Sequence, residues 1–291
     1  MIVRRGTGNG IGVAVDGFDA PAATDEEVAE LARLVYEEKI VVLTRQEITA
    51  ADFVALGRRF GEPEVYYQPM YRHPEHEEIF VSSNIKGDDG RVGVPRTGEF
   101  WHADYQFMPR PFGITMVYPQ VVPTQDRGTY FIDMAKAYQA LPADLRAAVD
   151  DKMAWHSARR YFKIRPSDVY RPIQDVLEDI EKETPAVAHP AVFPHPVTGE
   201  RILYISAALT YALDGADDDL LRVLLSHCGQ LDESLDREEI HLQVLNKGDL
   251  LIWDNRALVH RARHAGVAEP ASSFRVTVHD AYPFHPGLAD R

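Results

Sequence analysis

Two positions apart in the run "GEFWHADYQF", residues 98–107, stand an imidazole and a carboxylate, those of His102 and Asp104. Side chains of an extended strand alternate between its two faces, so both groups would project from the same face. Aromatic residues lie on both sides of the pair, which would give it an apolar setting. A His-x-Asp triplet also arises by chance in a chain with 12 histidines, so its meaning depends on what the rest of the chain supplies.

Another histidine that could complete a site lies far downstream, in "KGDLLIWDNRALVHRARH", residues 247–264. A predicted buried strand ends there at Asn255, and His260 follows in a new segment. A histidine on an apolar face is more often a core residue than a metal ligand. Two imidazoles and one carboxylate on one face, however, are the facial triad of non-haem iron(II), which leaves positions open for substrate and oxygen. We therefore predict that His102, Asp104 and His260 bind Fe(II) and form the catalytic centre.

A cation and a hydroxyl group suggest a further ligand of this site. Iron oxygenases with such a triad commonly take 2-oxoglutarate as a bidentate co-substrate, together with O2. The distal carboxylate of 2-oxoglutarate then needs a fixed cation, which a guanidinium group supplies best. Arg275, in "FRVTVHD", and the hydroxyl of Thr129, in "DRGTYF", are predicted to bind that carboxylate. For Arg127, an anion-binding role and an ordinary salt bridge both stay open.

The composition limits the classes of protein. The 291 residues carry a net charge of −14, which argues against a nucleic-acid binder because such a protein needs a basic face. No run approaches the roughly 18 apolar residues of a membrane-spanning helix, and the opening residues lack the apolar stretch of a signal peptide. Cys228 is the only cysteine, so the sequence excludes an internal disulfide and a cysteine-rich metal site. We expect a cytoplasmic protein without a nucleic-acid or membrane partner.

The elements that must position these residues form a mixture of early helices and later strands. A β-hairpin is predicted at the N-terminus, and Thr24 with Glu27 forms a capping box before the helical pattern "VAELARLVYEE". A second helix is predicted around residues 50–60, and apolar, β-branched runs separated by turns follow. Helices gathered early and strands spread widely later predict an α+β fold with an antiparallel core. Since no repeat or linker divides the chain, residues 1–291 are expected to form one domain.

The combined motifs resemble the taurine/2-oxoglutarate dioxygenase superfamily. The likeness rests on His102-x-Asp104, on "WDNRALVH" with His260, and on Arg275 farther along, and it covers nearly the whole chain. The resemblance implies an Fe(II)/2-oxoglutarate-dependent dioxygenase-type oxidoreductase. It also implies a double-stranded β-helix (jelly-roll) core with flanking helices, and it matches Thr129 and Arg275 to the co-substrate positions of the superfamily.

A closer likeness is to the isonitrile-forming branch of this superfamily, whose oxidase/decarboxylases work beside non-ribosomal peptide biosynthesis enzymes. Five blocks match in order: "VYYQPMY", "FWHADYQFMP", "DRGTYFID", "FKIRPSDVYRPI" and "WDNRALVHRARH". The branch converts a 3-(carboxymethylamino) fatty acid into a 3-isocyano acid and releases one carboxyl group as carbon dioxide. The resemblance implies the same amino diacid substrate here, with about two cycles of O2 and 2-oxoglutarate for each isonitrile.

A substrate with two carboxylates needs two anion-binding clusters, and the sequence offers candidates for both. Phenol hydroxyls can donate to a carboxylate while their rings wall a short aliphatic chain. A lysine and an arginine share one face of an extended "FKIRP" and could clamp a carboxylate. The predicted substrate-binding residues are Tyr66, Tyr67, Tyr71, Tyr105, Lys163, Arg165 and His264. A solvated strand face for the Lys-x-Arg pair and ordinary packing for the tyrosines stay open as alternatives.

Two other functions fit the same residues. One is a conventional 2-oxoglutarate-dependent hydroxylase of a free amino acid or other small carboxylate, which would give a stable alcohol. The other is a non-catalytic jelly-roll metal-binding protein, against which Thr129 and Arg275 argue because pure binding needs no co-substrate clamp. In the taurine enzyme an arginine holds the sulfonate one turn of sequence after the co-substrate arginine, whereas this chain has His279 there, so sulfonate specificity is doubtful. The sequence does not decide between a monomer and a homo-oligomer.

Overall fold

Strands β3 (Ile40–Leu43) and β16 (Leu250–Asp254) lie at the centre of the structure and are apolar on both faces. The structure is a computed structural model that describes residues 1–5, 10–87, 90–91, 93–125, 127–159, 162, 164–264 and 269–288. Successive side chains of a strand point to opposite faces, so Ile252 and Trp253 pack in two different hydrophobic cores. We call the core that contains Ile252, Leu31 and Phe53 the outer core, and the core that contains Trp253 and Phe131 the inner core. A sheet that is buried on both faces needs a layer of structure on each side.

The large sheet has eight strands, in the order β1-β2-β3-β16-β8-β18-β4, with β5 paired to β18. Strands β2 and β3 pair in parallel, and the other pairs described in this sheet are antiparallel. The antiparallel pairing of β1 and β2 confirms the predicted N-terminal hairpin. The further strands are β1 (Ile2–Arg5), β2 (Val13–Asp16), β4 (Glu62–Pro63), β5 (Phe80–Ser83), β8 (Ile114–Val121) and β18 (Ser272–His279).

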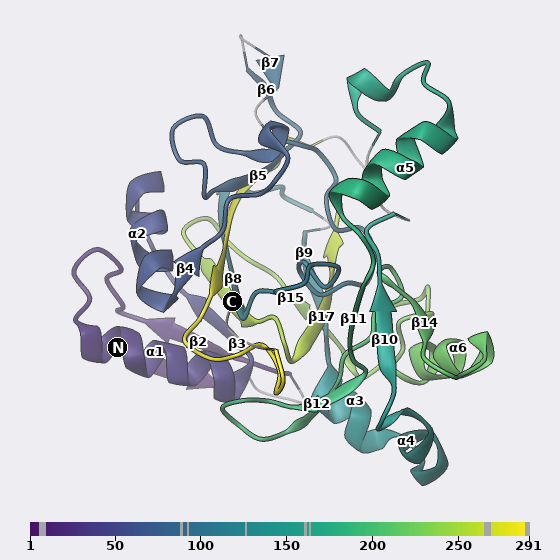
Figure 1. The fold of residues 1–291 in the computed structure, drawn as a ribbon. Coiled ribbons are helices and arrows are strands. Elements are labelled where there is room, and N and C mark those ends of the chain that lie inside the picture. The colour runs from purple at the N-terminus through teal and green to yellow at the C-terminus, as the bar shows by residue number, and fades with distance from the viewer. Residues whose placement is uncertain are drawn as a thin grey trace.

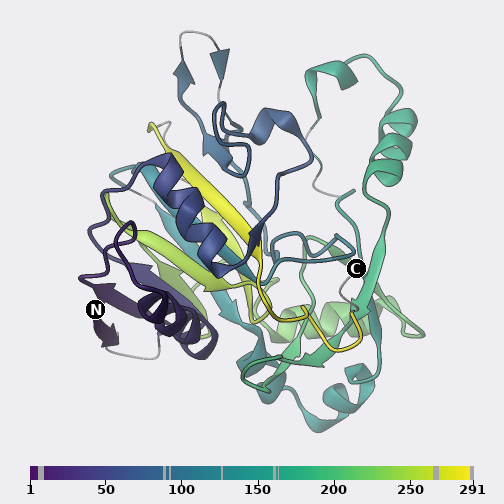
Figure 2. The same ribbon diagram turned by 60° about the vertical axis from the view of Figure 1, so that its left-hand side comes forward.

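Two helices cover the outer face of the large sheet, α1 (Asp25–Glu38) and α2 (Ala50–Phe60) (Figure 2). The predicted capping box at the start of α1 is confirmed, because the Thr24 hydroxyl accepts from the backbone N–H of Glu27 and the Glu27 carboxylate accepts from that of Thr24. A second capping box starts α2. The apolar faces of both helices pack on the large sheet and close the outer core.

The small sheet, in the order β15-β9-β17, lies against the inner core. Its strands are β9 (Gly128–Asp133), β15 (Ile240–Gln243) and β17 (Leu258–Arg263), near the middle of Figure 1. Phe131 of β9 packs edge-on against Trp253 of the large sheet, with 5.6 Å between the ring centroids. The two sheets therefore share one core, and the triad histidine on β17 lies at its edge.

The remaining elements lie outside these two sheets, and the mixture of helices and strands confirms the α+β class. Helix α5 was not predicted, because its N-cap is Pro172 and no side chain caps it, so the usual start signal is missing. Helix α5 lies at the upper right of the molecule in Figure 1. These elements are β6 (Lys86–Gly87), β7 (Gly90–Arg91), α3 (Met134–Ala140), α4 (Ala143–Val149), β10 (Met153–His156), α5 (Ile173–Glu183), β11 (Val187–Pro190), β12 (Val192–Pro194), β13 (Arg201–Leu203), β14 (Thr210–Leu213), α6 (Asp218–His227) and the 3-10 turns Pro69–Tyr71 and Pro166–Asp168.

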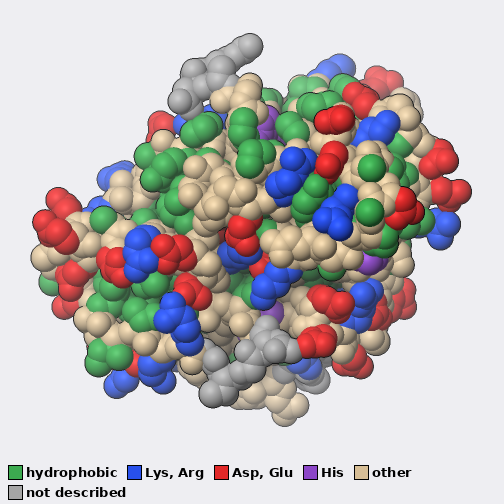
Figure 3. Space-filling view, turned by 90° about the horizontal axis from the view of Figure 1, so that it is seen from below, with side chains coloured by type: hydrophobic (Ala, Val, Ile, Leu, Met, Phe, Trp, Pro, Cys, Tyr) green, Lys and Arg blue, Asp and Glu red, His purple; other side chains and the backbone are tan. Residues whose placement is uncertain are grey.

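Charged side chains of both signs are intermixed over the face shown in Figure 3. Among the charged side chains of the protein, Arg59 pairs with Asp25 and Arg171 with Asp179. Within the described part of the chain, no helix has the length and apolar content needed to cross a membrane.

Candidate active site

The two triad histidines face each other across a short antiparallel bridge. The backbone N–H of His102 donates to the carbonyl of His260 at 3.0 Å, and the N–H of His260 donates to the carbonyl of His102 at 2.8 Å. Residues that exchange both bonds lie directly opposite each other, so their side chains emerge on the same face. The two imidazole centroids are accordingly 4.1 Å apart.

Asp104 reaches the same place from a turn, which corrects the prediction of one extended strand. His102 forms the bridge, whereas residues 104–107 form a turn in which Tyr105 has a left-handed backbone with φ of 57°. A left-handed conformation is costly for a bulky residue and persists only where its surroundings hold it. The expected convergence is nevertheless present: His102, Asp104 and His260 each offer one ligand atom, and these atoms lie within 4.8 Å of one another.

The imidazoles have the form that a metal requires. The Nδ1–H of His102 donates to the carbonyl of Phe100 at 2.8 Å, which leaves its Nε2 lone pair directed at the site. The Nε2 atoms of His102 and His260 lie 3.7 and 3.8 Å from the carboxylate oxygens of Asp104. Burial lowers the pKa of both imidazoles, so both are neutral near neutral pH.

The Asp104 carboxylate is held on both oxygens. Arg275 Nη1 donates to Oδ1 at 2.7 Å, and the Thr115 hydroxyl donates to Oδ2 at 2.9 Å. Burial alone would raise the pKa of Asp104, but Arg275, the two histidines and the Thr115 hydroxyl together outweigh it, and the pKa lies below its ordinary value. The carboxylate is therefore ionised and oriented. Sequence reasoning missed Thr115 because one threonine in an apolar strand carries no local signal.

These residues fit an Fe(II) ion. Two neutral imidazole nitrogens and one ionised carboxylate converge, and they are the donor set of the facial triad. The Nδ1–H bond of His102 to a backbone carbonyl is the kind of contact that orients metal-bound histidines.

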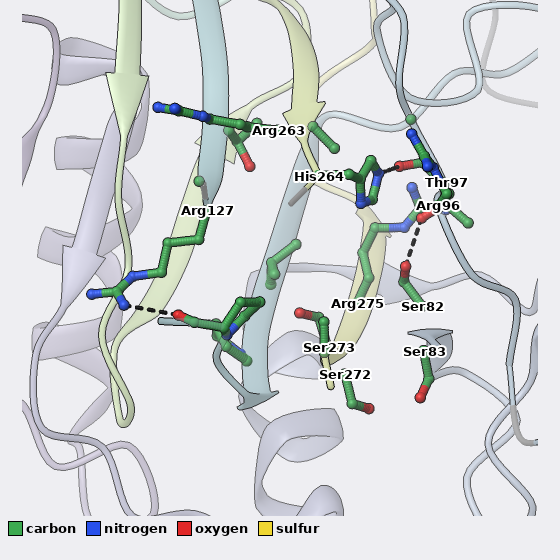
Figure 4. A pocket seen from close by; sticks show the side chains of 18 of the residues that line it. Ser82, Ser83, Arg96, Thr97, Arg127, Arg263, His264, Ser272, Ser273 and Arg275 are labelled. Carbon is green, nitrogen blue, oxygen red and sulfur yellow. Dashed lines mark hydrogen bonds between the residues drawn. The ribbon is translucent and has the colours of Figure 1, made fainter. Parts of the chain in front are cut away.

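A wide cavity of about 440 Å³ lies beside the triad, and Figure 4 shows side chains that line it. The predicted co-substrate residues Thr129 and Arg275 both line it, together with His102 and His260. Arg127 also lines it, but its guanidinium donates to the carbonyl of Pro123 at 2.8 Å and to the side chain of Asn246 at 3.2 Å.

A smaller, aromatic cavity of about 120 Å³ also lies beside the triad. Four predicted substrate-binding residues line it: Tyr66, Tyr67, Tyr71 and Tyr105. Their rings pack on one another and on Phe80, with centroids 4.6 to 5.6 Å from Tyr66. Burial raises the pKa of each hydroxyl, that of Tyr71 to about 12, so all four stay protonated and can donate a hydrogen bond.

Arg275 and His102 line both cavities, as do Phe80, Thr97 and Gly98. The Arg275 guanidinium lies over the ring of Phe80 at 4.0 Å and over that of Tyr105 at 5.4 Å, and it donates to the Tyr105 hydroxyl at 3.3 Å. It therefore connects Asp104, the wide cavity and a tyrosine of the aromatic cavity.

Other predicted residues lie elsewhere. His264 lines the wide cavity rather than the tyrosine cavity, and its Nε2–H donates to the carbonyl of Thr97 at 2.8 Å (Figure 4). Arg165 is outside the described lining of both cavities and pairs with Asp168 and Glu183, although its guanidinium lies 5.1 Å from the ring of Phe162, which lines the aromatic cavity. Lys163 lies outside the described residues.

His279 is also remote from the described lining of both cavities. Its ring packs on Phe112 at 4.3 Å, and its Nε2 lies 3.5 Å from the Glu64 carboxylate.

Comparison with known proteins finds relatives that match most of this chain. The family model "Taurine catabolism dioxygenase TauD, TfdA family" matches residues 3–278. An alpha-ketoglutarate-dependent 2,4-dichlorophenoxyacetate dioxygenase of Cupriavidus pinatubonensis is 28% identical over 87% of this chain and 89% of the relative. Pentalenolactone F synthase of Streptomyces arenae is 28% identical over 89% of each chain. The crystal structure of AAD-2 in complex with Mn(II) and N-oxalylglycine has the same fold, with a TM-score of 0.76, 23% identity, and coverage of 97% of this chain and 100% of AAD-2.

Proposed function

Because the chain belongs to the taurine catabolism dioxygenase TauD, TfdA family and is an enzyme that uses Fe(II), 2-oxoglutarate and O2, we propose that it forms an isonitrile. The substrate is a 3-(carboxymethylamino) fatty acid and the product a 3-isocyano acid. The observation that carries this proposal is the pair of cavities that meet at His102 and Arg275, one lined by the co-substrate candidates and the other by four protonated tyrosines.

We place Fe(II) on His102, Asp104 and His260, and 2-oxoglutarate in the wide cavity. Thr129 and Arg275 are its candidate carboxylate partners, since both line that cavity. Burial alone would lower the pKa of Arg275, but Asp104 and Tyr105 raise it, so the guanidinium stays charged beside an incoming anion. Bound Fe(II) with 2-oxoglutarate supplies the oxidation. The chain itself binds the substrate, orients it and excludes water.

The aromatic cavity suits the amino diacid. Its tyrosine hydroxyls donate to a carboxylate, while Phe107, Phe162 and Leu209 wall an aliphatic chain. Arg165 and Lys163 remain candidates for the second carboxylate, and His264 for a contact from the wide cavity. The relative from Cupriavidus pinatubonensis is named for 2,4-dichlorophenoxyacetate, which also carries a carboxymethyl group on a heteroatom.

The conversion balances as R–NH–CH2–COOH to R–NC, carbon dioxide, four protons and four electrons. One O2 and one 2-oxoglutarate together accept two electrons and two protons from the substrate and give succinate, carbon dioxide and water. About two cycles are therefore needed. The wide cavity must therefore exchange succinate for 2-oxoglutarate while the half-oxidised substrate stays in the aromatic cavity. Two cavities that share lining residues but are otherwise distinct suit such an exchange, because one can be refilled while the other stays occupied.

We also propose a jelly-roll core, a single domain and a biosynthetic setting for this chain. The two sheets around one core are the candidate jelly roll, and residues 1–291 one oxygenase domain. Work beside non-ribosomal peptide biosynthesis enzymes, in the cytoplasm, is consistent with a chain whose single cysteine, Cys228, is buried and free.

The test is an aerobic incubation with Fe(II), 2-oxoglutarate and one of two matched substrates, followed by mass spectrometry. One is a 3-(carboxymethylamino) acid, and the other is the 3-amino acid without the carboxymethyl group. We expect an isonitrile from the first alone, because the second lacks the carbon from which the isonitrile is made.

The competing function is hydroxylation of a free amino acid or other small carboxylate. A stable alcohol from the 3-amino acid, without turnover of the diacid, would establish it and leave the iron site in place. No oxidation of any carboxylate, with intact metal binding, would instead favour the non-catalytic binding protein.

A further inference from the structure

We propose that Asn255 is a positioning residue that holds the metal ligand Asp104 through its backbone. The inference rests on the metal site of the proposed function. Asn255 Oδ1 accepts from the N–H of Asp104 at 2.8 Å, and its Nδ2 donates to the carbonyl of Asp104 at 2.7 Å. One side-chain amide thus occupies both backbone groups of a residue 151 positions away.

The amide is itself rigidly held. Asn255 follows β16 directly and is fully buried, with 0% of its surface exposed. Its backbone N–H donates to the carbonyl of Gly113 at 2.8 Å, and its Nδ2 also donates to the carbonyl of Phe112 at 3.1 Å. The described polar groups of the side chain are therefore all engaged on backbone, and none points to a cavity.

The need for such a clamp lies in the turn itself. The chain leaves the bridge at His102, and Asp104 enters a turn whose next residue, Tyr105, is left-handed. A strained turn relaxes unless other bonds hold it. The bonds to Asn255 lie next to the strained position, while Thr115 and Arg275 orient the carboxylate. The clamp therefore fixes where the Asp104 side chain begins, and the other two residues fix where it points.

Mn(II) binding to the metal-free protein, measured by calorimetry without O2 or 2-oxoglutarate, tests the inference. Asn255→Ala removes both bonds, and Asn255→Asp retains the Oδ1 acceptor but removes the Nδ2 donor. Removing a group that orients a metal ligand costs about 10- to 100-fold in affinity, and we expect a loss in that range for Asn255→Ala. Asn255→Asp should lose at least as much, because its new oxygen would face the carbonyls of Asp104 and Phe112.

Asn84, which is exposed, supplies a control for the kind of bonds that Asn255 makes. Its Nδ2 donates to the carbonyl of Glu269 at 2.7 Å, and its Oδ1 accepts from the N–H of Ala271 at 2.8 Å, so it makes the same kind of clamp on another part of the backbone. Asn84→Ala should leave the Mn(II) affinity unchanged. Folded Asn255→Ala protein that binds Mn(II) as tightly as the parent would overturn the inference.

A measurement on the unmodified protein covers the case in which the Asn255 variants do not fold. The clamp predicts that the Asp104 amide is protected from hydrogen exchange in the metal-free protein, and exchange at the rate of an open loop would contradict it. Failure of the underlying metal site gives a different result. In that case His102→Ala would bind Mn(II) as tightly as the parent.

Discussion

Arg275 lines both cavities and donates to Asp104, and in the proposed function its charge also binds the incoming co-substrate. Arg275→Lys keeps the positive charge but loses the planar fork that reaches Asp104 and Tyr105 together. We expect the 2-oxoglutarate concentration for half-maximal rate to rise by about tenfold or more, since a charge-assisted bond contributes about 1.5–3 kcal/mol.

Lys163→Ala is the counterpart of this experiment, measured in the same assay. It should weaken use of the amino diacid and leave the 2-oxoglutarate requirement nearly unchanged. If Lys163→Ala instead affects 2-oxoglutarate alone, the two anion sites have been assigned the wrong way round.

Residue types and spacing were enough to predict that His102, Asp104 and His260 converge, because few functions need two histidines, one aspartate and a distant arginine. They were not enough to predict the groups that hold the triad. Asn255 was interpreted only as the end of a strand, since its partner Asp104 is 151 positions away in the sequence. Thr115 and the left-handed Tyr105 were missed for the same reason, because both depend on contacts that exist only in the folded chain.

At the scale of elements, helix α2 and strand β18 connect the outer core to the site. Gly57 of α2 faces Val276, and a Cβ atom at Gly57 would lie 2.8 Å from its Cγ1 atom. Alanine in place of glycine favours a helix by about 1 kcal/mol, but overpacking a filled core costs about 1–3 kcal/mol. Gly57→Ala should therefore destabilise the protein, and it should raise the 2-oxoglutarate requirement because β18 carries Arg275.

The double variant Gly57→Ala, Val276→Ala provides the control for this prediction. It removes the methyl group that the new Cβ would meet, so chemical denaturation should show a smaller loss of stability than the sum of the two single variants. Strict additivity would mean that the close contact between α2 and β18 is not the cause.

Periodicity and capping signals predicted the N-terminal hairpin, α1, α2 and the main buried strands. They failed where such signals were absent. Helix α5 begins at a proline without a side-chain cap, and the run from His102 to Asp104 has the alternation of a strand although only its first residue pairs. The tertiary bonds at Asp104 override the local pattern there.

At the scale of the whole molecule, buried histidines away from the triad, among them His156, His189 and His279, contribute to the response to acid. Burial lowers the pKa of His189 and His279 to about 4, and it lowers that of His156 well below the ordinary value. The unfolded chain takes up protons near pH 6.5 that the folded chain does not, so stability is greatest above that pH and falls as the pH drops toward about 4.

Urea denaturation at several pH values measures this effect. Each such histidine contributes a slope of up to about 1.4 kcal/mol per pH unit in this window. His189→Gln should reduce the slope. A free energy of unfolding that stays constant, or that rises as the pH falls through this window, would contradict neutral buried histidines.

The ratio of succinate to isonitrile tests the proposed reaction most directly. The purified enzyme would be given Fe(II), limiting 3-(carboxymethylamino) acid and excess 2-oxoglutarate in air, and both products would be quantified at completion. We predict about two succinates for each isonitrile, because the four-electron conversion needs two turns of co-substrate. One succinate for each stable hydroxylated product, with no isonitrile, would contradict the account.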